Sequence, residues 1–187
     1  MYSLIKEYNI KKFLIVFIII VIIGYLLPQR VVIPVENGKF SDWNSKSFWF
    51  GNWGTSIVHK GIDIFNKKGT PILSTIDGIV VFNGQREKGG NVVIVLGPRW
   101  LLHYYSHLDT IDAKLFSFVK RGEKVGTMGD SGNAKGKPFH LHYQIMRVFL
   151  NPFKMDSSTQ GYKKAFFVDP NKFLKEQMNY KTDKKEE

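Results

Sequence analysis

The residues best suited to chemistry are His140 and His142, which stand two apart in the chain. Side chains two apart on a strand point to the same face, so a strand over residues 139–146 would bring both imidazoles into one site. The residues that alternate with them are apolar and would form the opposite face: Phe139, Leu141, Tyr143 and Ile145. Imidazole is the commonest metal ligand and the commonest general base near neutral pH. The pair therefore predicts either role, although a His-x-His pair also arises by chance as two half-buried polar side chains.

A second pair, His59 and Asp63, offers two more metal ligands on either side of Gly61. A helix is disfavoured here by Gly61 and by the β-branched Ile62 and Ile64. On an extended strand, Cα atoms four residues apart lie about 13 Å from each other, which is too far for both side chains to reach one ion. We therefore predict that Gly61 bends the chain if both residues bind metal.

His103 and His107 lie four apart in a third stretch, Trp100–Leu108, which is rich in apolar and aromatic residues. If this stretch is a regular strand, both imidazoles lie on one face, about 13 Å from each other. Only one of them can then enter a metal site a few ångströms wide. We predict that the other is a rim or packing histidine.

Short β-branched and aromatic runs separated by Gly-rich turns predict the elements that position these residues. Three such runs predict an antiparallel meander: Gly78–Asn83, Asn91–Leu96 and Trp100–Leu108. A turn and a strand follow within Val119–Met128, and a loop over 129–138 leads into the strand that carries the His-x-His pair. Near the end of the chain, Asp169 is predicted to cap a short helix that begins at Pro170.

The N-terminus predicts a membrane segment, because Phe13–Leu27 is a run of fifteen apolar residues that follows Lys11 and Lys12. A helix of this length spans about 22 Å, short of the roughly 30 Å hydrocarbon core, which favours a cleaved signal peptide. No small-x-small cleavage motif follows the run, however, so we favour an uncleaved anchor with the lysines at the inner interface. The positive-inside rule then places the chain after Arg30 outside the cytoplasm.

The composition narrows the classes of protein and of site. The 187-residue chain contains no cysteine, which excludes disulfides and thiolate ligands, so any metal must be held by nitrogen and oxygen. The formal net charge is +11, and residues 114–154 contain eight basic residues against two acidic ones. This cluster favours an anionic partner, with a solvated basic face as the alternative. Nucleic acid is not expected as the partner, because no helix-turn-helix, finger or RNA-binding motif is present.

Four of the five histidines fall in segments that can converge with Asp63. Two histidines and one carboxylate would leave a fourth zinc position for water, as in catalytic zinc sites. The motifs that carry these residues resemble those of the lysostaphin-type, or LytM-like, zinc endopeptidases, which cut peptide bonds in bacterial peptidoglycan. The matching motifs occur in the family's order within Phe50–Leu174: H-K-G-I-D, G-T-P, H-Y-Y-S-H-L, G-N-A-x-G and H-L-H. Several ordered motifs together are far more specific than any one of them.

The resemblance implies one Zn²⁺ ion with three protein ligands and two unligated catalytic histidines. The implied ligands are His59, Asp63 and His142, and the implied catalytic residues are His107 and His140. The resemblance also implies a mainly β fold, a small antiparallel sheet with the site in a groove over it. The transmembrane helix predicted from the apolar run precedes this domain. Asn133 matches an asparagine that the family keeps near the groove, and we predict that Asn133 and His103 contact substrate. Residues 149–167 depart from the shortest family members as an insertion.

The predicted organisation has four parts: 1–30, a cytoplasmic N-terminus and transmembrane anchor; 31–49, a linker and loop; 50–175, the LytM-like peptidase domain; and 176–187, a flexible charged tail. The predicted function is zinc-dependent hydrolysis of peptidoglycan stem peptides or cross-bridges, with zinc-bound water as the nucleophile. Two alternatives are a non-enzymatic regulator that activates another cell-wall hydrolase, and a structural zinc site closed by His103. The predicted location is the cell membrane with the catalytic domain outside the cytoplasm, in contact with peptidoglycan peptides and with an unidentified regulatory protein.

Overall fold

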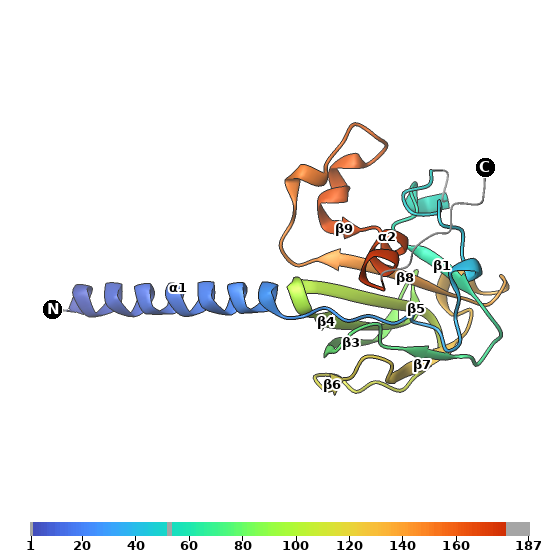
Figure 1. The fold of residues 1–187 in the computed structure, drawn as a ribbon, viewed down its shortest axis with the longest axis horizontal. Coiled ribbons are helices and arrows are strands. Elements are labelled where there is room, and N and C mark those ends of the chain that lie inside the picture. Colours follow the sequence, from blue (N-terminus) through green and yellow to red (C-terminus); the bar gives the residue numbers. More distant parts are fainter. Residues whose placement is uncertain (1, 52–53, 179–187) are drawn as a thin grey trace.

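The computed structural model describes residues 2–51 and 54–178. Figure 1 shows a β domain from one end of which the long helix α1 projects. The strands are β1 (Ile62–Phe65), β2 (Pro71–Leu73), β3 (Gly78–Arg86), β4 (Gly90–Gly97), β5 (Leu101–Ile111), β6 (Phe118–Val119), β7 (Lys124–Met128), β8 (His140–Arg147) and β9 (Phe167–Val168). The helices are α1 (Tyr2–Leu26), α2 (Pro170–Gln177) and the short 3₁₀ turns η1 (Phe40–Asp42), η2 (Gly54–Ser56), η3 (Pro98–Trp100), η4 (Gly132–Ala134), η5 (Pro152–Lys154) and η6 (Gly161–Phe166).

The strands form one antiparallel sheet in the order β1-β8-β5-β4-β3-β6, with β7 pairing β2 and β5, and β9 pairing β8. This confirms the predicted mainly β fold and the meander of three strands. β3 and β4 extend further toward their turn than predicted, because residues 83–86 pair with residues 90–93. The turn between these two strands therefore spans only residues 87–89 instead of 84–90, and residues 84–86 and 90 belong to the strands.

The alternation along β8 sorts its side chains as predicted. Leu141, Tyr143 and Ile145 are fully buried in the core, and Phe139 packs against the edge of that core. The residues between them face the opposite side of the sheet, where a cleft lies. Burial of one face fixes the strand register, because a shift by one residue would expose every core side chain of the strand.

Residues 31–49 are part of the domain and do not form the predicted linker. Val31, Val35 and Trp43 are buried in the same core as the sheet. The Val32 N–H donates to the Thr75 carbonyl at 3.0 Å, and Val35 forms an antiparallel bridge with Ile72. Residues 31–43 therefore contribute to the core of the sheet, because the apolar residues of this segment find partners there.

The C-terminal helix α2 begins as predicted. The Asp169 carboxylate accepts from the backbone N–H groups of Asn171 and Lys172, and Pro170 occupies the first turn. The helix packs onto the core through Phe173 and Leu174. It continues to Gln177, past the predicted start of the tail at residue 176, and the rest of that predicted tail, residues 179–187, lies outside the described residues.

The 18 residues Asn9–Leu26 of α1 have a mean hydropathy of 2.2, and from Phe13 on the helix is apolar on all sides, so α1 is long enough, by length and composition, to cross a membrane. Eighteen helical residues span about 27 Å, close to the roughly 30 Å hydrocarbon core. Figure 1 shows α1 projecting away from the domain along most of its length. Its last turns touch the domain at η3.

Candidate metal centre and groove

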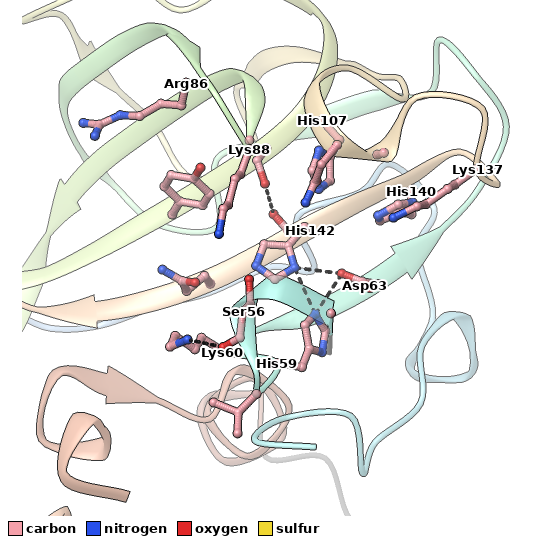
Figure 2. Close-up of a pocket in the computed structure, with 18 of the residues that line it drawn as sticks. Ser56, His59, Lys60, Asp63, Arg86, Lys88, His107, Lys137, His140 and His142 are labelled. Carbon is pink, nitrogen blue, oxygen red and sulfur yellow. Dashed lines mark hydrogen bonds and ion pairs between the residues drawn. The ribbon is translucent and has the colours of Figure 1, made fainter. Parts of the chain in front are cut away.

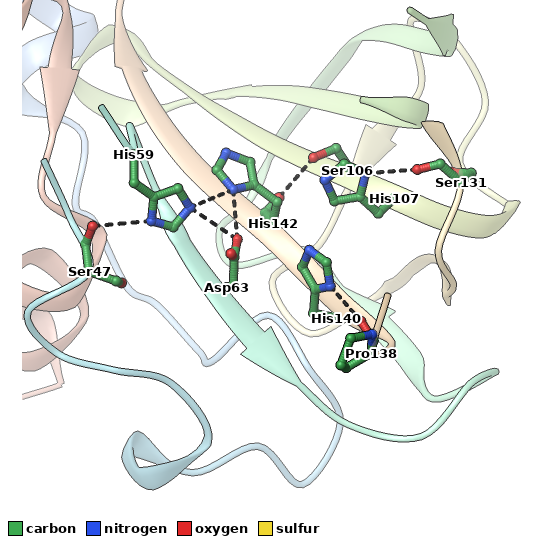
Figure 3. A network of polar contacts seen from close by, with 9 residues as sticks. All are labelled: Ser47, His59, Asp63, Ser106, His107, Ser131, Pro138, His140 and His142. Carbon is green, nitrogen blue, oxygen red and sulfur yellow. Dashed lines mark hydrogen bonds and ion pairs between the residues drawn. The ribbon is translucent and has the colours of Figure 1, made fainter. Parts of the chain in front are cut away.

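Three of the predicted ligands come together on the cleft side of the sheet. β1 and β8 pair so that Asp63 lies directly opposite His142, and His59 stands just before β1. Asp63 Oδ1 lies 2.8 Å from His142 Nδ1 and 3.1 Å from His59 Nε2, and the two nitrogens are 3.0 Å apart. Figure 3 shows the three side chains pointing toward one another from these elements. The structure therefore brings together all three residues that the resemblance implies as ligands.

Gly61 lies at the bend that joins His59 to β1. Its φ angle lies outside the left-handed region, so the bend does not demand glycine through its backbone angles. Space demands it instead: a Cβ atom at Gly61 would lie 2.4 Å from the Tyr143 carbonyl oxygen and 3.0 Å from His142 Cε1. The prediction that the chain bends at Gly61 matches the structure, but the glycine is needed for close approach of the backbone to β8.

The surroundings of the cluster orient its carboxylate and its two imidazole rings. His59 Nδ1 lies 3.1 Å from the Ser47 carbonyl oxygen, which can only accept, so Nδ1 donates to it and Nε2 is the nitrogen directed at the cluster. Burial alone would raise the pKa of Asp63, but hydrogen bonds and charge from His142 and His59 outweigh it and hold that pKa well below its usual range. Asp63 is therefore ionised at neutral pH, and it faces two imidazole nitrogens.

The geometry of the cluster fits a zinc ion. Tetrahedral zinc binds nitrogen and carboxylate oxygen at about 2.0–2.2 Å, so its ligand atoms lie roughly 3.3 Å from each other. The three donor atoms here lie 2.8 to 3.1 Å apart, slightly closer than that separation. Two imidazoles and one carboxylate also match the donor set of catalytic zinc sites and leave one position open.

His107 and His140 lie beside the cluster and do not belong to it. Their ring centroids are 5.0 Å apart, and the ring of His107 is 6.0 Å from that of His142. His107 Nδ1 lies 2.8 Å from the Ser131 carbonyl oxygen, and His140 Nδ1 lies 2.7 Å from the Pro138 carbonyl oxygen. Each Nδ1 therefore carries a proton that it donates to a carbonyl, so each neutral ring keeps Nε2 as a proton acceptor. Burial, and then the charge of His142, lowers the pKa of His107 to about 4, so His107 is neutral at pH 7.

A bulge in β5 places His107 in the cleft. Tyr105 pairs with Val93 and Leu108 with Asn91, so β5 has one residue more than β4 between these pairs. His107 itself has a φ of 62° in the left-handed region, which is uncommon for a residue other than glycine. Such an extra residue reverses which face the following side chains occupy. Regular alternation would have directed His107 into the core.

His103 lies on the other face of the sheet, which corrects its predicted place beside His107. It is fully buried, its Nδ1 lies 2.6 Å from the Tyr143 hydroxyl, and its ring packs against Phe173. It does not line the cleft, so it does not reach a substrate or close a zinc site there. Strand alternation before the bulge explains this: His103 pairs with Ile145 and shares its core face. His103 is thus the packing histidine that was predicted for one of the two residues His103 and His107.

The cleft over the sheet has a volume of about 1070 Å³ and contains the metal cluster, His107 and His140. Figure 2 shows cationic side chains around it. Four such residues line the cleft: Lys60, Arg86, Lys88 and Lys137. Asp63 is the only carboxylate that lines it among the described residues. Anionic groups of a ligand would therefore meet positive charge on several sides.

The charge pattern of the sequence had located this cluster incorrectly. Of the eight basic residues within 114–154, only Lys137 lines the cleft. The other three cations of the cleft are Lys60, Arg86 at the end of β3 and Lys88 in the β3–β4 turn. Burial, and then the charges of Lys163 and Lys88, lowers the pKa of Lys60, so these amines lie near one another. Lys163 belongs to the 149–167 segment, none of whose residues lines the cleft in the described part of the chain. Long-range sheet pairing assembles these cations, which is why local charge density missed them.

Asn133 lines the cleft, as expected for a substrate contact. It lies in η4, and its backbone N–H donates to the Lys88 carbonyl at 3.0 Å. The neighbouring Ser131 holds this loop to the sheet, because its hydroxyl donates to the Leu108 carbonyl at 2.7 Å and accepts from the Asn91 N–H. Sequence reasoning missed Ser131, whose carbonyl orients His107. Its place beside the G-N-A-x-G motif was the available signal.

The fold and the site place the chain in a known class of protein, the small antiparallel β domains of LytM and lysostaphin type. The catalytic domain of lysostaphin, an antimicrobial peptidase from Staphylococcus simulans, superimposes with a TM-score of 0.59 at 25% identity, covering 75% of this chain and 94% of that domain. The chain belongs to Peptidase family M23, whose profile matches residues 57–156.

Relatives in this family carry different names. The murein hydrolase activator NlpD of Salmonella dublin is 39% identical over 105 residues, which cover 55% of this chain and 27% of NlpD. The DD-carboxypeptidase/endopeptidase Mpg of Neisseria meningitidis serogroup B is 29% identical over 119 residues, which cover 62% of this chain and 27% of Mpg. The chain thus spans about a quarter of the length of these curated relatives.

Proposed function

We propose that this protein is a zinc-dependent endopeptidase that hydrolyses peptide bonds in peptidoglycan stem peptides or cross-bridges. The observation that carries the proposal is the complete constellation in one cleft. His59, Asp63 and His142 form a three-donor cluster that fits zinc, and His107 and His140 stand beside it without joining it. The names of the relatives lysostaphin and Mpg, both peptidases, support peptide hydrolysis as the reaction.

Each residue has a role that its surroundings favour. Zinc, when bound by the cluster, lowers the pKa of water to about 7 and polarises a carbonyl group. The Ser47 carbonyl holds His59 with Nε2 toward the cluster, and Asp63 supplies the negative charge there. His107 and His140 direct Nδ1 at carbonyl oxygens, so Nε2 of either ring in its neutral form can take the proton from an attacking water and return it to the leaving amine.

The cations of the cleft favour a substrate with carboxylates. A peptide that carries free carboxylate groups gains from Lys60, Arg86 and Lys88, whereas a chain of glycine residues offers no charge within the peptide. A stem peptide that carries such carboxylate groups would meet these cations in the cleft. We therefore propose stem peptides and the bonds next to them, ahead of glycine bridges, as the substrate of this site.

A regulatory role is the second candidate, because the identity to the activator NlpD is 39% and the identity to Mpg is 29%. Digestion of purified peptidoglycan by the detergent-solubilised full chain, followed by mass analysis of the fragments, separates the two. The enzyme proposal predicts zinc-dependent release of peptides with new amino termini, and loss of that release in His107→Ala. Absence of cleavage by the zinc-loaded protein, with stimulation of an added murein hydrolase, would favour the regulator.

We also propose that α1 is retained as an uncleaved membrane anchor with the domain outside the cytoplasm. The apolar span Asn9–Leu26 and the lysines that precede its most apolar part support this. The expected result is full-length protein in the membrane fraction, with its original N-terminus by Edman sequencing. A soluble product that begins between residues 28 and 36 would contradict the anchor.

A further inference from the structure

An apolar surface lies next to α1 on the domain. The segment that follows β8 exposes five large apolar side chains: Val148, Phe149, Leu150, Phe153 and Met155. We call this set the seating patch. Phe153 is 96% exposed and Leu150 is 50% exposed. So many apolar side chains in eight residues are unusual on a water-facing surface and mark an interaction site.

The seating patch is continuous with the end of α1 through aromatic contacts. The ring of Phe149 lies 6.3 Å from that of Tyr25 in α1 and 5.9 Å, edge-on, from that of Trp100. The Trp100 indole N–H donates to the Val21 carbonyl at 3.0 Å. Figure 1 shows the segment after β8 at the end of the domain from which α1 projects. Phe149 therefore joins the patch to the last turns of the candidate membrane span.

Two local features fix this contact. Gly24 is buried in α1, and a Cβ atom there would lie 2.4 Å from the Trp100 indole, so the glycine lets the ring pack on the helix. Arg99 and Trp100 both have positive φ angles, 59° and 57°, at the β4–β5 turn. Two successive left-handed residues other than glycine raise the free energy of the backbone. Such strain persists only where the surrounding structure over-determines it, and it is often found at functional sites. The turn directs Trp100 onto α1.

We propose that the seating patch rests in the interfacial layer of the membrane beside α1, so that the domain is seated on the bilayer at a defined height. This inference rests on the proposed anchor and is independent of whether the protein cleaves peptides. Aromatic residues such as Trp100 and Tyr25 prefer this layer, and apolar side chains such as Phe153 enter the acyl boundary. The exposed cations Arg99 and Lys154 adjoin Trp100 and Phe153 in the chain, and Arg30 follows the end of α1, so all three suit lipid phosphates.

The seated position sets the height of the cleft. β8 runs from the cleft to the patch, and five residues separate His142 from Arg147, about 17 Å of strand. β5 runs a similar distance to the other side of the site, since His107 is six positions after Leu101, about 20 Å along the strand. The cleft would therefore act on peptides that lie within about 20 Å of the membrane surface.

The absence of cysteine in the natural sequence allows a direct test with single labels. The full chain, with one environment-sensitive fluorophore on Leu150→Cys or Phe153→Cys, is placed in phosphatidylcholine–phosphatidylglycerol vesicles. Quenching is measured with a nitroxide-labelled lipid and with aqueous iodide. Phe17→Cys in α1 reports the anchor. Lys67→Cys is the matched domain control, because it is exposed and lies beyond Phe65, which pairs with His140 at the end of β8 remote from the patch.

The proposal predicts that labels at 150 and 153 lose fluorescence to the nitroxide lipid and are shielded from iodide, whereas the label at 67 shows the reverse. Quenching of 150 and 153 by iodide, like 67, while the label at 17 stays lipid-quenched, would overturn the seating and leave the anchor standing. Protection of the labels at 150 and 153 from both quenchers would mean that a protein covers the patch. This result would also overturn the proposed seating on the bilayer. Iodide quenching at 17 would overturn the anchor and the seating together. Zinc binding and peptide cleavage, measured on the same samples, report separately on the proposed function.

Discussion

Substituting Gly61 by alanine tests how closely β1 must approach β8 to build the metal cluster. An added Cβ atom would lie 2.4 Å from the Tyr143 carbonyl oxygen, against an ordinary contact of at least 3.4 Å, so the two must separate by 3.4 − 2.4 = 1.0 Å. The carbonyl is backbone and cannot rotate away. Because Asp63 and His142 are paired across these strands, the separation displaces two ligands from each other.

The size of the effect follows from this displacement. A misplacement of about 1 Å in a catalytic constellation costs on the order of 10²-fold in rate. Forced overpacking of a fitted interior costs about 1–3 kcal/mol of unfolding free energy. We therefore expect Gly61→Ala to lower turnover by about 10²-fold, to weaken zinc binding, and to destabilise the fold by about 1–3 kcal/mol.

The assay is competition for zinc with a chromophoric chelator, together with urea unfolding and peptidoglycan digestion. Gly51→Ala is the matched control, because an added Cβ atom there meets nothing within 4 Å. The control should behave as the parent protein. If Gly61→Ala binds zinc with the parent affinity and unfolds at the parent urea concentration, close approach of the two strands is not what the glycine provides.

Three further predictions follow from the fold and the cleft. Burial lowers the pKa of His103 to about 3 from 6.5, so between those pH values the unfolded chain binds a proton that the folded chain does not, and stability falls as pH falls. Urea unfolding should show a loss of about 2 kcal/mol in unfolding free energy between pH 7.5 and pH 5. His103→Gln should flatten that dependence. Lys88→Glu should raise KM for a carboxylate-bearing stem peptide by about 5-fold at low salt without changing zinc content. Lys114→Glu, which does not line the cleft, should leave KM unchanged. Equal KM values in the parent protein and both variants would contradict the electrostatic argument. Asp169→Ala should lower unfolding free energy by about 1 kcal/mol through loss of the α2 cap, and an unchanged urea midpoint would show that the cap adds nothing.

Local pattern predicted the strands well where one face of the sheet is buried. The period of two in β8 identified both the core residues and the side on which His140 and His142 lie. The same reasoning was wrong for His103 and His107, because it assumed an unbroken strand. The bulge at His107 depends on pairing with β4, a strand distant in sequence, and on loops that accept its side chain. A single sequence carries no local mark of such an insertion.

The segment 31–49 shows a second limit of local pattern. We predicted a linker and loop there, yet Val35 and Trp43 are buried against the sheet. Its partners, such as Ile72 and Asn171, lie far along the chain. Non-local burial also assembles the cations of the cleft and brings Tyr143 against Gly61, so the reason for the glycine emerges only from the pairing of β1 with β8.

The most direct test of the central claim is zinc content and turnover measured on the same five alanine variants. The account predicts that His59→Ala, Asp63→Ala and His142→Ala lose zinc and activity together, because each removes one of three donors. It predicts that His107→Ala and His140→Ala keep stoichiometric zinc and lose about 10²- to 10⁴-fold in turnover, the range for a positioned acid or base. Loss of zinc in His107→Ala or His140→Ala, with zinc retained in any of the three ligand variants, would contradict the assignment.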